Sequence, residues 1–141
     1  MANPESFFSE DVRQHLSFIQ GVINRMNSNS FSMKGWMVAI VSALCAVYAS
    51  NANTRAACVC FAAAIIVDTL FCSLDAYYLK MEKQYRKLYN NVVSTPGKTD
   101  FIMDAKGFKV SFWEAIKSPS VWILYSVVAA ILIITFLLVI L

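Results

Sequence analysis

Histidine, glycine and proline are scarce in this chain of 141 residues, which holds one, four and three of them. The single histidine, His15, has no cysteine or second histidine near it at the spacing of a metal site. The few glycines form no phosphate-binding loop, and no Ser-His-Asp set can be assembled. We therefore expect no enzyme, no catalytic residue, and neither a metal ion nor another cofactor.

Charged residues are also sparse, at 15% of the chain against 58% hydrophobic residues, and the mean hydropathy is +0.56. Three apolar stretches, residues 35–48, 56–74 and 121–141, approach or reach the roughly 20 helical residues that cross a bilayer. The last has no charged side chain, and the second is interrupted only by Asp68. The sequence therefore predicts an integral membrane protein with three transmembrane helices. Its cysteines lie in or beside these stretches, and we interpret them as small hydrophobic residues.

The basic residues predict how the chain is oriented. Arg55 is the only one between the first two apolar stretches. The others precede the first stretch or lie between the second and the third: Arg13, Arg25, Lys34, Lys80, Lys83, Arg86, Lys87, Lys98, Lys106, Lys109 and Lys117. Because basic residues stay on the cytoplasmic side, we expect a cytoplasmic N-terminus and a C-terminus outside. The aromatic belt fits this orientation, with Trp36, Tyr77, Trp113 and Trp122 at the inner interface and Tyr48 at the outer one.

Two polar segments carry apolar side chains at helical spacing. The first follows a helix start at Asn3-Pro4-Glu5 and contains Phe8, Val12, Leu16, Ile19, Ile23 and Met26. The second continues the second apolar stretch without a helix breaker and contains Tyr78, Met81, Tyr85, Leu88 and Val92. Antiparallel packing of the two helices would cover both stripes and form a cytoplasmic bundle. The alternatives are packing between subunits and an N-terminal helix that lies on the membrane surface.

These elements predict an all-α membrane protein in five segments. They are an N-terminal cytoplasmic amphipathic helix (1–32), a first transmembrane helix (33–50), a second that continues into a cytoplasmic helix (56–93), a cytoplasmic loop with a short interfacial helix (94–119) and a third transmembrane helix (120–141). Within the loop, Thr95-Pro96-Gly97 ends the long helix, residues 101–110 predict a short hairpin, and Ser111-Phe112-Trp113-Glu114 is a capping-box pattern. The polar run 27–30 is interpreted as a hinge or as a polar collar at the headgroups.

Asp68 is the strongest single candidate for function, because a carboxyl group inside a span is costly and normally faces protein or water. Asp75 and Glu82 follow at intervals of seven residues, so that an acidic line runs down one side of the second helix. The functional interpretation is the wall of a cation pathway, with Asp75 at its mouth. The structural interpretation is a protonated or hydrogen-bonded Asp68, and an ordinary ion pair between Glu82 and Arg86.

A basic stripe on the second helix, with two cations near the membrane on the first helix, is the candidate ligand site: Arg25, Lys34, Lys80, Lys83 and Lys87. Juxtamembrane cations most often meet lipid headgroups. The alternative is a polyanion such as a nucleotide or oligonucleotide, whose bases could stack on nearby tyrosines: Tyr77, Tyr78, Tyr85 and Tyr89.

Two juxtamembrane segments, about half of the chain, carry a resemblance. They are Asn24-Arg25-Met26 with Asn29-Ser30-Phe31 and Lys34-Gly35-Trp36, then Leu74-Asp75-Ala76-Tyr77-Tyr78-Leu79 with Glu82 and Tyr85-Arg86-Lys87-Leu88-Tyr89. They resemble small bacterial membrane proteins of anti-phage defence operons, in particular the membrane effector subunit of the Hailong system. The resemblance implies a tetrameric inner-membrane channel whose partner nucleotidyltransferase makes nucleic-acid oligomers that bind it. Opening during infection would depolarise the membrane and stop growth.

We therefore expect a homo-oligomeric, ligand-gated ion channel, since three thin spans of one chain cannot enclose an ion pathway. Small residues four apart in the spans, such as Ala39 and Ala43, permit the close helix contacts that assembly needs. One alternative is a membrane anchor or scaffold that recruits a soluble enzyme through its cytoplasmic helices. The other is a small transporter with Asp68 as its proton-coupling carboxylate.

Overall fold

The structure, a computed structural model, describes residues 9–50, 54–95 and 100–140. Four helices follow one another in these residues: α1 (Glu10–Ser50), α2 (Thr54–Ser94), α3 (Phe112–Ile116) and α4 (Pro119–Ile140). The three long helices are the expected ones, and each is long and apolar enough to cross a membrane. The protein is an all-helical membrane protein.

Helix α1 begins at Glu10, and Ser9 caps it. The backbone N–H of Val12 donates to Ser9 Oγ at 3.4 Å, and the first turn carries Glu10 and Asp11, which the helix dipole favours. The expected helix start at residues 3–5 lies outside the described residues. No boundary separates the predicted segments 1–32 and 33–50, because α1 continues through the polar run 27–30 to Ser50.

The polar run does not break α1, because Ser30 within it and Ser32 just after it make hydrogen bonds that leave the helix intact. Ser32 donates to the carbonyl of Ser28, one turn earlier, at 3.0 Å. Ser30 instead points away from its own helix and donates to a side chain of α2. A serine and asparagine segment that would favour a turn in isolation is therefore helical here.

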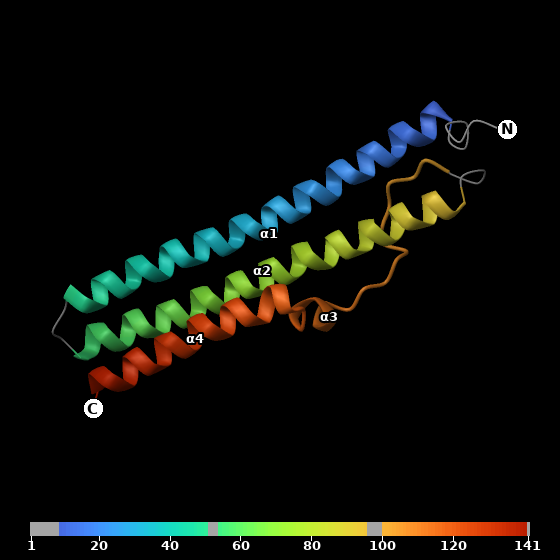
Figure 1. Ribbon diagram of the computed structural model, residues 1–141. Helices are drawn as coiled ribbons and strands as arrows, with labels where there is room; N and C mark the ends of the chain where they lie inside the picture. The colour runs from blue at the N-terminus through green and yellow to red at the C-terminus, as the bar shows by residue number, and fades with distance from the viewer. Residues whose placement is uncertain (1–8, 51–53, 96–99, 141) are drawn as a thin grey trace.

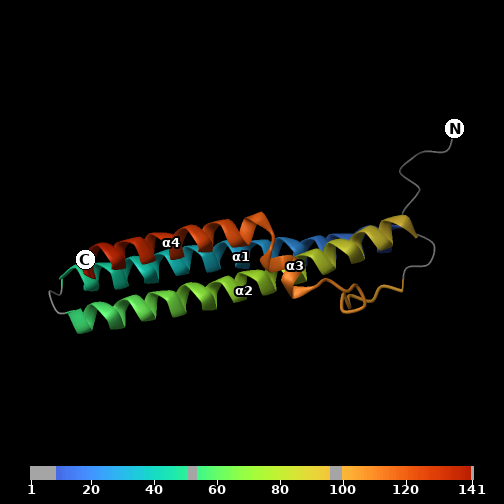
Figure 2. The ribbon, with the colours of Figure 1, turned by 90° about the horizontal axis from the view of Figure 1, so that it is seen from below.

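Helices α1 and α2 form an antiparallel hairpin along their whole length, about 60 Å for 41 residues each (Figure 1). Helix α4 is about 33 Å long and lies along only half of this hairpin, antiparallel to α2 (Figures 1 and 2). The other half is accompanied by the irregular segment 100–111, which we call the strap. The described C-terminal end of α4 lies near the end of α1 and the start of α2, far from the start of α1 (Figure 1).

Two hydrophobic cores divide the rod. Along α4, the buried residues include Met37, Ala64, Val121 and Leu132; we call this the apolar half. The polar half is built on Val12, Ile19, Ile23, Leu88, Val92 and Ala105. Most of the first predicted stripe thus packs against the C-terminal part of the second, and the strap contributes Ala105 to the same core. Phe8, which begins the first stripe, lies outside the described residues.

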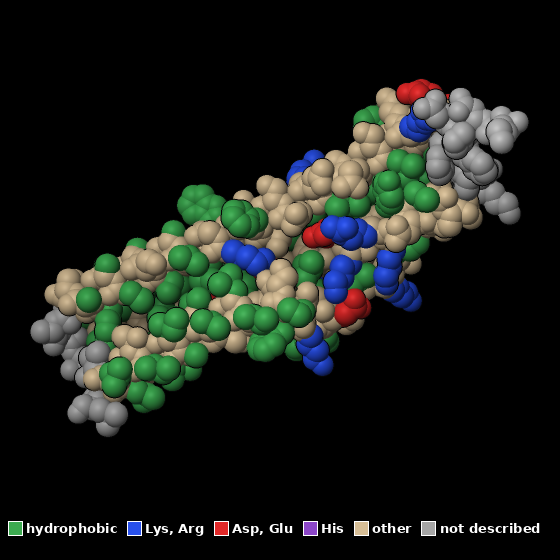
Figure 3. All heavy atoms as spheres, viewed as in Figure 1, with side chains coloured by type: hydrophobic (Ala, Val, Ile, Leu, Met, Phe, Trp, Pro, Cys, Tyr) green, Lys and Arg blue, Asp and Glu red, His purple; other side chains and the backbone are tan. Residues whose placement is uncertain are grey.

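The outer surface of the apolar half identifies the part of the rod that the membrane surrounds. Large apolar side chains such as Val59, Ile66 and Leu138 are 60–74% exposed there. Hydrophobic side chains dominate this half, and Lys and Arg side chains gather on the other (Figure 3). Water would penalise such a surface, whereas lipid does not. Trp36, Trp113 and Trp122, predicted at an interface, are all largely exposed.

The predicted hairpin in residues 101–110 is wrong, because the described residues contain no strand. Asp104 Oδ1 accepts from the N–H of Lys106 at 2.9 Å, and the N–H of Phe108 donates to the carbonyl of Ala105 at 3.1 Å, so the segment turns but does not pair with itself. Its carbonyl groups are bound by side chains of α2 instead. Such long-range partners are invisible in the local sequence.

The short helix predicted after Ser111 is present as α3, although Ser111 makes no side-chain cap hydrogen bond. Helix α4 then begins at once, with Pro119 at the first position, where its missing N–H is not needed. The carbonyl of Ser118 accepts from the N–H groups of Val121 and Trp122. Strap, α3 and α4 therefore form a nearly continuous connection from the polar half to the apolar half.

Candidate functional site

A charged cluster joins α1 to α2 where the apolar half meets the polar half. Asp75 is fully buried on α2, and its Oδ2 lies 2.6 Å from Lys34 Nζ on α1. Ser30 donates its hydroxyl hydrogen to Asp75 Oδ1, and Lys34 Nζ also donates to Ser30 Oγ at 3.0 Å. We call Ser30, Lys34 and Asp75 the interhelical latch.

In the latch, Lys34 and Asp75 offset the desolvation cost that each charged group would carry if it were buried alone. Moving a carboxylate or an ammonium group out of water costs several kcal/mol, on the order of what a close partner returns at low dielectric. The Lys34 side chain is 20% exposed, so it keeps some solvent contact while it neutralises a carboxylate that has none. We therefore expect the pair to favour one register of α1 against α2.

Asp68 lies two turns from Asp75 on the same helix face, about 10.5 Å deeper in the apolar half. It is 6% exposed, and its Oδ1 atom is buried without a hydrogen-bond partner in the described structure. Cys72 lies between the two carboxylates, and Tyr125 of α4 lies close enough to interact with all three. Both aspartates therefore face the interior of their own three-helix bundle.

Tyr125 completes this buried group, and its position is the least expected from the sequence. Its side chain is 3% exposed and its hydroxyl faces the Asp75 carboxylate, yet that hydroxyl makes no hydrogen bond of regular geometry. A phenol inside an otherwise apolar span is a signal that could have been used, because a buried tyrosine usually has a partner for its hydroxyl. Ser30 could have been found too, since it lies one turn before Lys34.

Glu82, the third member of the acidic line, forms the ion pair with Arg86 that its spacing predicts. It is 8% exposed, and its Oε1 lies 2.7 Å from Arg86 Nε one turn later. This pair belongs to the polar half. The acidic line is thus buried along its length, with one member unpartnered, one in the latch and one in a local ion pair.

The candidate ligand residues do not converge on one point. Lys34 belongs to the latch, and Arg25 is exposed on α1, about 140° around that helix from Ser30. Lys80, Lys83 and Lys87 share one face of α2. Among them Lys80 is half-buried and makes no ion pair or hydrogen bond with the described residues.

The strap occupies much of the basic face of α2. Lys83 Nζ lies 3.2 Å from Glu114 Oε1 of α3, and Lys87 Nζ donates to the carbonyl of Lys109 at 3.1 Å. Gln84 and Tyr85 donate to two more strap carbonyls, of Phe108 at 3.0 Å and Met103 at 3.3 Å, so Tyr85 is engaged with the chain itself. A ligand at Lys83 or Lys87 would compete with these contacts.

His15 is buried and packs edge-on against Phe101, with 5.5 Å between the ring centroids. Its Nε2 atom has no hydrogen-bond partner, and Phe101 has an unusual positive φ of 56°. No group of three potential metal ligands occurs in the residues that the structure describes. His15 therefore packs under the strap, far along α1 from the latch.

Comparison with known proteins adds no relative. No protein-family model, curated protein or solved structure matches this chain.

Proposed function

We propose that the protein is a homo-oligomeric membrane effector of bacterial anti-phage defence that forms a ligand-gated cation channel. Asp68 carries this proposal. A carboxylate inside a span is expensive, and one with an unpartnered oxygen has no structural bond that explains it. Attraction of a passing cation is a function that such an oxygen can perform. The resemblance supplies the tetrameric state and the inner membrane, and the distribution of the basic residues supplies the cytoplasmic N-terminus and the periplasmic C-terminus.

We place the conducting path between protomers because the hollows of one protomer do not reach the two aspartates. The cavity between the three long helices near Ala64 measures about 20 Å³, the volume of about one water molecule. A larger hollow of about 330 Å³ between α1 and α4 is lined mostly by apolar side chains and by neither Asp68 nor Asp75. A conducting path must then form between protomers, and opening must turn Asp68 and Asp75 from the bundle interior toward that path. In this closed arrangement Lys34 neutralises Asp75, so the latch would have to break when the channel opens.

The proposed ligand is a nucleotide or single-stranded DNA oligomer made by a partner nucleotidyltransferase, bound by Arg25, Lys80, Lys83 and Lys87. A polyanion at Lys83 would displace Glu114 from its ion pair. Because α3 is separated from α4 by only two residues, movement of Glu114 would pull directly on the helix that contacts Asp75 through Tyr125. This gives a physical route from the ligand to the span. Membrane lipids are expected around the apolar half.

Two alternative functions, a membrane scaffold and a small transporter, make different predictions. The scaffold interpretation needs free apolar stripes on the polar half, but Ile19, Ile23 and Leu88 are buried against each other there. A small proton-coupled transporter is the second candidate, and the position of Asp68 inside one protomer favours it. It predicts pH-dependent exchange of a substrate without a large conductance.

The proposal is tested by ion flux into liposomes that contain the purified protein, with and without short single-stranded DNA. We expect flux that changes with the oligonucleotide, and a lower cation flux for Asp68→Asn in an oligomer of unchanged size. The matched control is Thr69→Val, at the neighbouring position that faces outward. Unchanged conductance and ion selectivity in Asp68→Asn would remove this residue from the pathway.

The ligand site is tested separately. Lys80→Glu with Lys83→Glu should weaken oligonucleotide binding and reduce its salt dependence, because two phosphate-neutralising cations are lost. Lys106→Glu with Lys117→Glu, at two exposed positions outside the basic stripe, is the charge-matched control. Oligonucleotide binding that is unchanged by the paired substitutions would indicate that the basic stripe contacts lipid headgroups instead.

A further inference from the structure

Helices α1 and α4 leave a groove between them in the apolar half. Both helices lie on the same side of α2, and α4 packs mainly against α2 (Figure 2). The groove is the hollow of about 330 Å³ described above, and its walls include Val38, Val41 and Cys45 of α1 and Val128 and Ile131 of α4. Its lining is mostly apolar, so the groove suits an apolar occupant.

The groove is open toward the membrane. Val38 on its α1 wall is 48% exposed, and Ile131 on its α4 wall is 58% exposed. Wall atoms that face an empty space lose the dispersion contacts that a partner would give them. The material that surrounds this half of the rod is lipid hydrocarbon, which is as apolar as the wall itself. We therefore expect hydrocarbon chain, and not water, against these residues.

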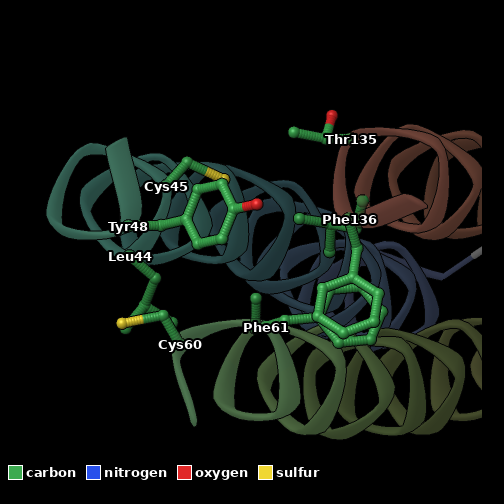
Figure 4. Close-up of a pocket in the computed structure, with 9 residues that line it drawn as sticks. Leu44, Cys45, Tyr48, Cys60, Phe61, Thr135 and Phe136 are labelled. Carbon is green, nitrogen blue, oxygen red and sulfur yellow. The ribbon is translucent and has the colours of Figure 1, made fainter. Parts of the chain in front are cut away.

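The groove has a wide part and a narrow end. Cys45 and Leu132 line both the groove and the cavity of about 20 Å³, so the two spaces adjoin. In that cavity, shown in Figure 4, Phe61 and Phe136 stack with their ring centroids 4.1 Å apart. The hollow between α1 and α4 is thus wide on the side of the polar half and narrows toward the end of α1.

Lys34 lies on the groove side of α1, toward the polar half. It precedes Val41 by seven residues and Cys45 by eleven, so all three lie within about 40° of one another around the helix. The rise from Lys34 to Cys45 is about 16.5 Å. One leaflet contributes about 15 Å to a hydrocarbon core of about 30 Å. The groove therefore extends through about one leaflet from a cation at its boundary.

The ammonium group of Lys34 can accept a further partner. It carries three hydrogens, and its Nζ atom lies 3.0 Å from Ser30 Oγ and 2.6 Å from Asp75 Oδ2. These two contacts leave one hydrogen, and the side chain is 20% exposed. Because Ser30 lies one turn before Lys34, the ammonium group points back toward the polar half, which is the side on which lipid headgroups lie.

We propose that the groove between α1 and α4 binds one acyl chain of a phospholipid, and that Lys34 donates a hydrogen bond to the phosphate of the same lipid. A phospholipid carries an anion at the headgroup and an apolar chain of leaflet depth, in the order in which Lys34 and the groove follow each other. A helix of a second copy would fill the groove but offer no anion, because Asp68 and Asp75 of the described spans are both buried. This inference does not rest on the proposed channel.

The groove is tested by native mass spectrometry of the full chain in detergent, titrated with phosphatidylglycerol. We expect about one lipid per protomer in the wild type. Ser42→Phe and Val128→Phe place a ring in the groove and should each weaken binding about tenfold, the effect of keeping about two methylene groups out of it. Val47→Phe and Val127→Phe, at positions 50% and 51% exposed outside the groove, are the matched controls and should bind as the wild type does.

The headgroup contact is tested on the same instrument. Lys34→Gln with Asp75→Asn keeps a neutral pair between the helices and should weaken phosphatidylglycerol binding about tenfold, because one charge-assisted hydrogen bond is lost. Binding of a diacylglycerol with the same chains should not change. Asp75→Asn alone removes the competing carboxylate and should strengthen phosphatidylglycerol binding, a gain that poor folding cannot produce.

Three results would overturn the inference. The first is a wild type that retains no phospholipid, and the second is equal binding by the groove variants and their controls. The third is a change of oligomer mass in Ser42→Phe and Val128→Phe with an unchanged lipid count, which would mean that a second copy occupies the groove. Equal loss of both lipids in the paired variant would overturn the role of Lys34. None of these measurements involves ion flux or DNA, so their failure would leave the channel proposal intact.

Discussion

Removal of Lys34 from the interhelical latch is the perturbation whose consequence the structure defines most sharply. Lys34→Met keeps the length of the side chain and deletes its charge, so the fully buried carboxylate of Asp75 loses its only cation. Removing one partner of a buried ion pair costs about 3–5 kcal/mol. Because the Lys34 side chain is 20% exposed and Ser30 still donates to Asp75, we expect the lower end, about 3 kcal/mol.

The free energy of unfolding is measured in detergent micelles by titration with a denaturing detergent and followed by tryptophan fluorescence. Lys117→Met, at an exposed position beyond α3, removes the same charge and should change this free energy by less than about 0.5 kcal/mol. Asp75→Asn in the Lys34→Met background removes the unpaired charge and should recover most of the loss. A coupling energy of about 2 kcal/mol is therefore expected between the two positions.

The result that refutes this reasoning is equal destabilisation by Lys34→Met and Lys117→Met. A second refuting result is additivity, in which Asp75→Asn destabilises the Lys34→Met protein as much as it destabilises the wild type. Either outcome would mean that Asp75 is not charged beside Lys34, and the latch would then have no electrostatic role in holding α1 against α2.

Two further predictions concern the polar half. Ile19→Ala should destabilise the hairpin by about 2–5 kcal/mol because Ile19 is fully buried between α1 and α2, whereas Phe18→Ala, at a position 56% exposed, should change stability by less than about 1 kcal/mol in the same denaturation assay. Lys83→Ala should cost less than about 1 kcal/mol, since its ion pair with Glu114 is exposed, and the small effect should vanish at high salt; a large, salt-independent loss would contradict that assignment.

The periodic features of the fold were predictable because they depend on neighbours one or two turns away. Three apolar runs, two amphipathic stripes and the single acidic face of α2 all follow from spacing along one helix. The pair between Glu82 and Arg86 is of the same kind and was confirmed. The latch is different, because it depends on the register of α1 against α2, which places Ser30 and Lys34 opposite a residue more than 40 positions later.

The structure of the strap could not be predicted either, because it depends on partners far away in the sequence. Turn residues near Asp104 correctly indicated a change of direction, but a hairpin also needs the two arms to satisfy each other's backbone groups. Here Gln84, Tyr85 and Lys87 bind carbonyls of the strap, so its arms need no mutual partner. The lysines of α2 were interpreted as a ligand stripe from the sequence, and part of that stripe is engaged within the chain.

The latch lies where two kinds of contact between α1 and α2 meet, and this position supports the gating role proposed for it. In the polar half, α1 and α2 are held together by a hydrophobic core that includes Ile19 and Leu88. In the apolar half, lipid provides no hydrophobic force between the helices, so packing and polar contacts must hold them together. The Lys34–Asp75 pair lies at the boundary between these two halves. A force transmitted along α2 from the strap would therefore act on the polar contact that holds α1 to α2 at this boundary, beside the carboxylates.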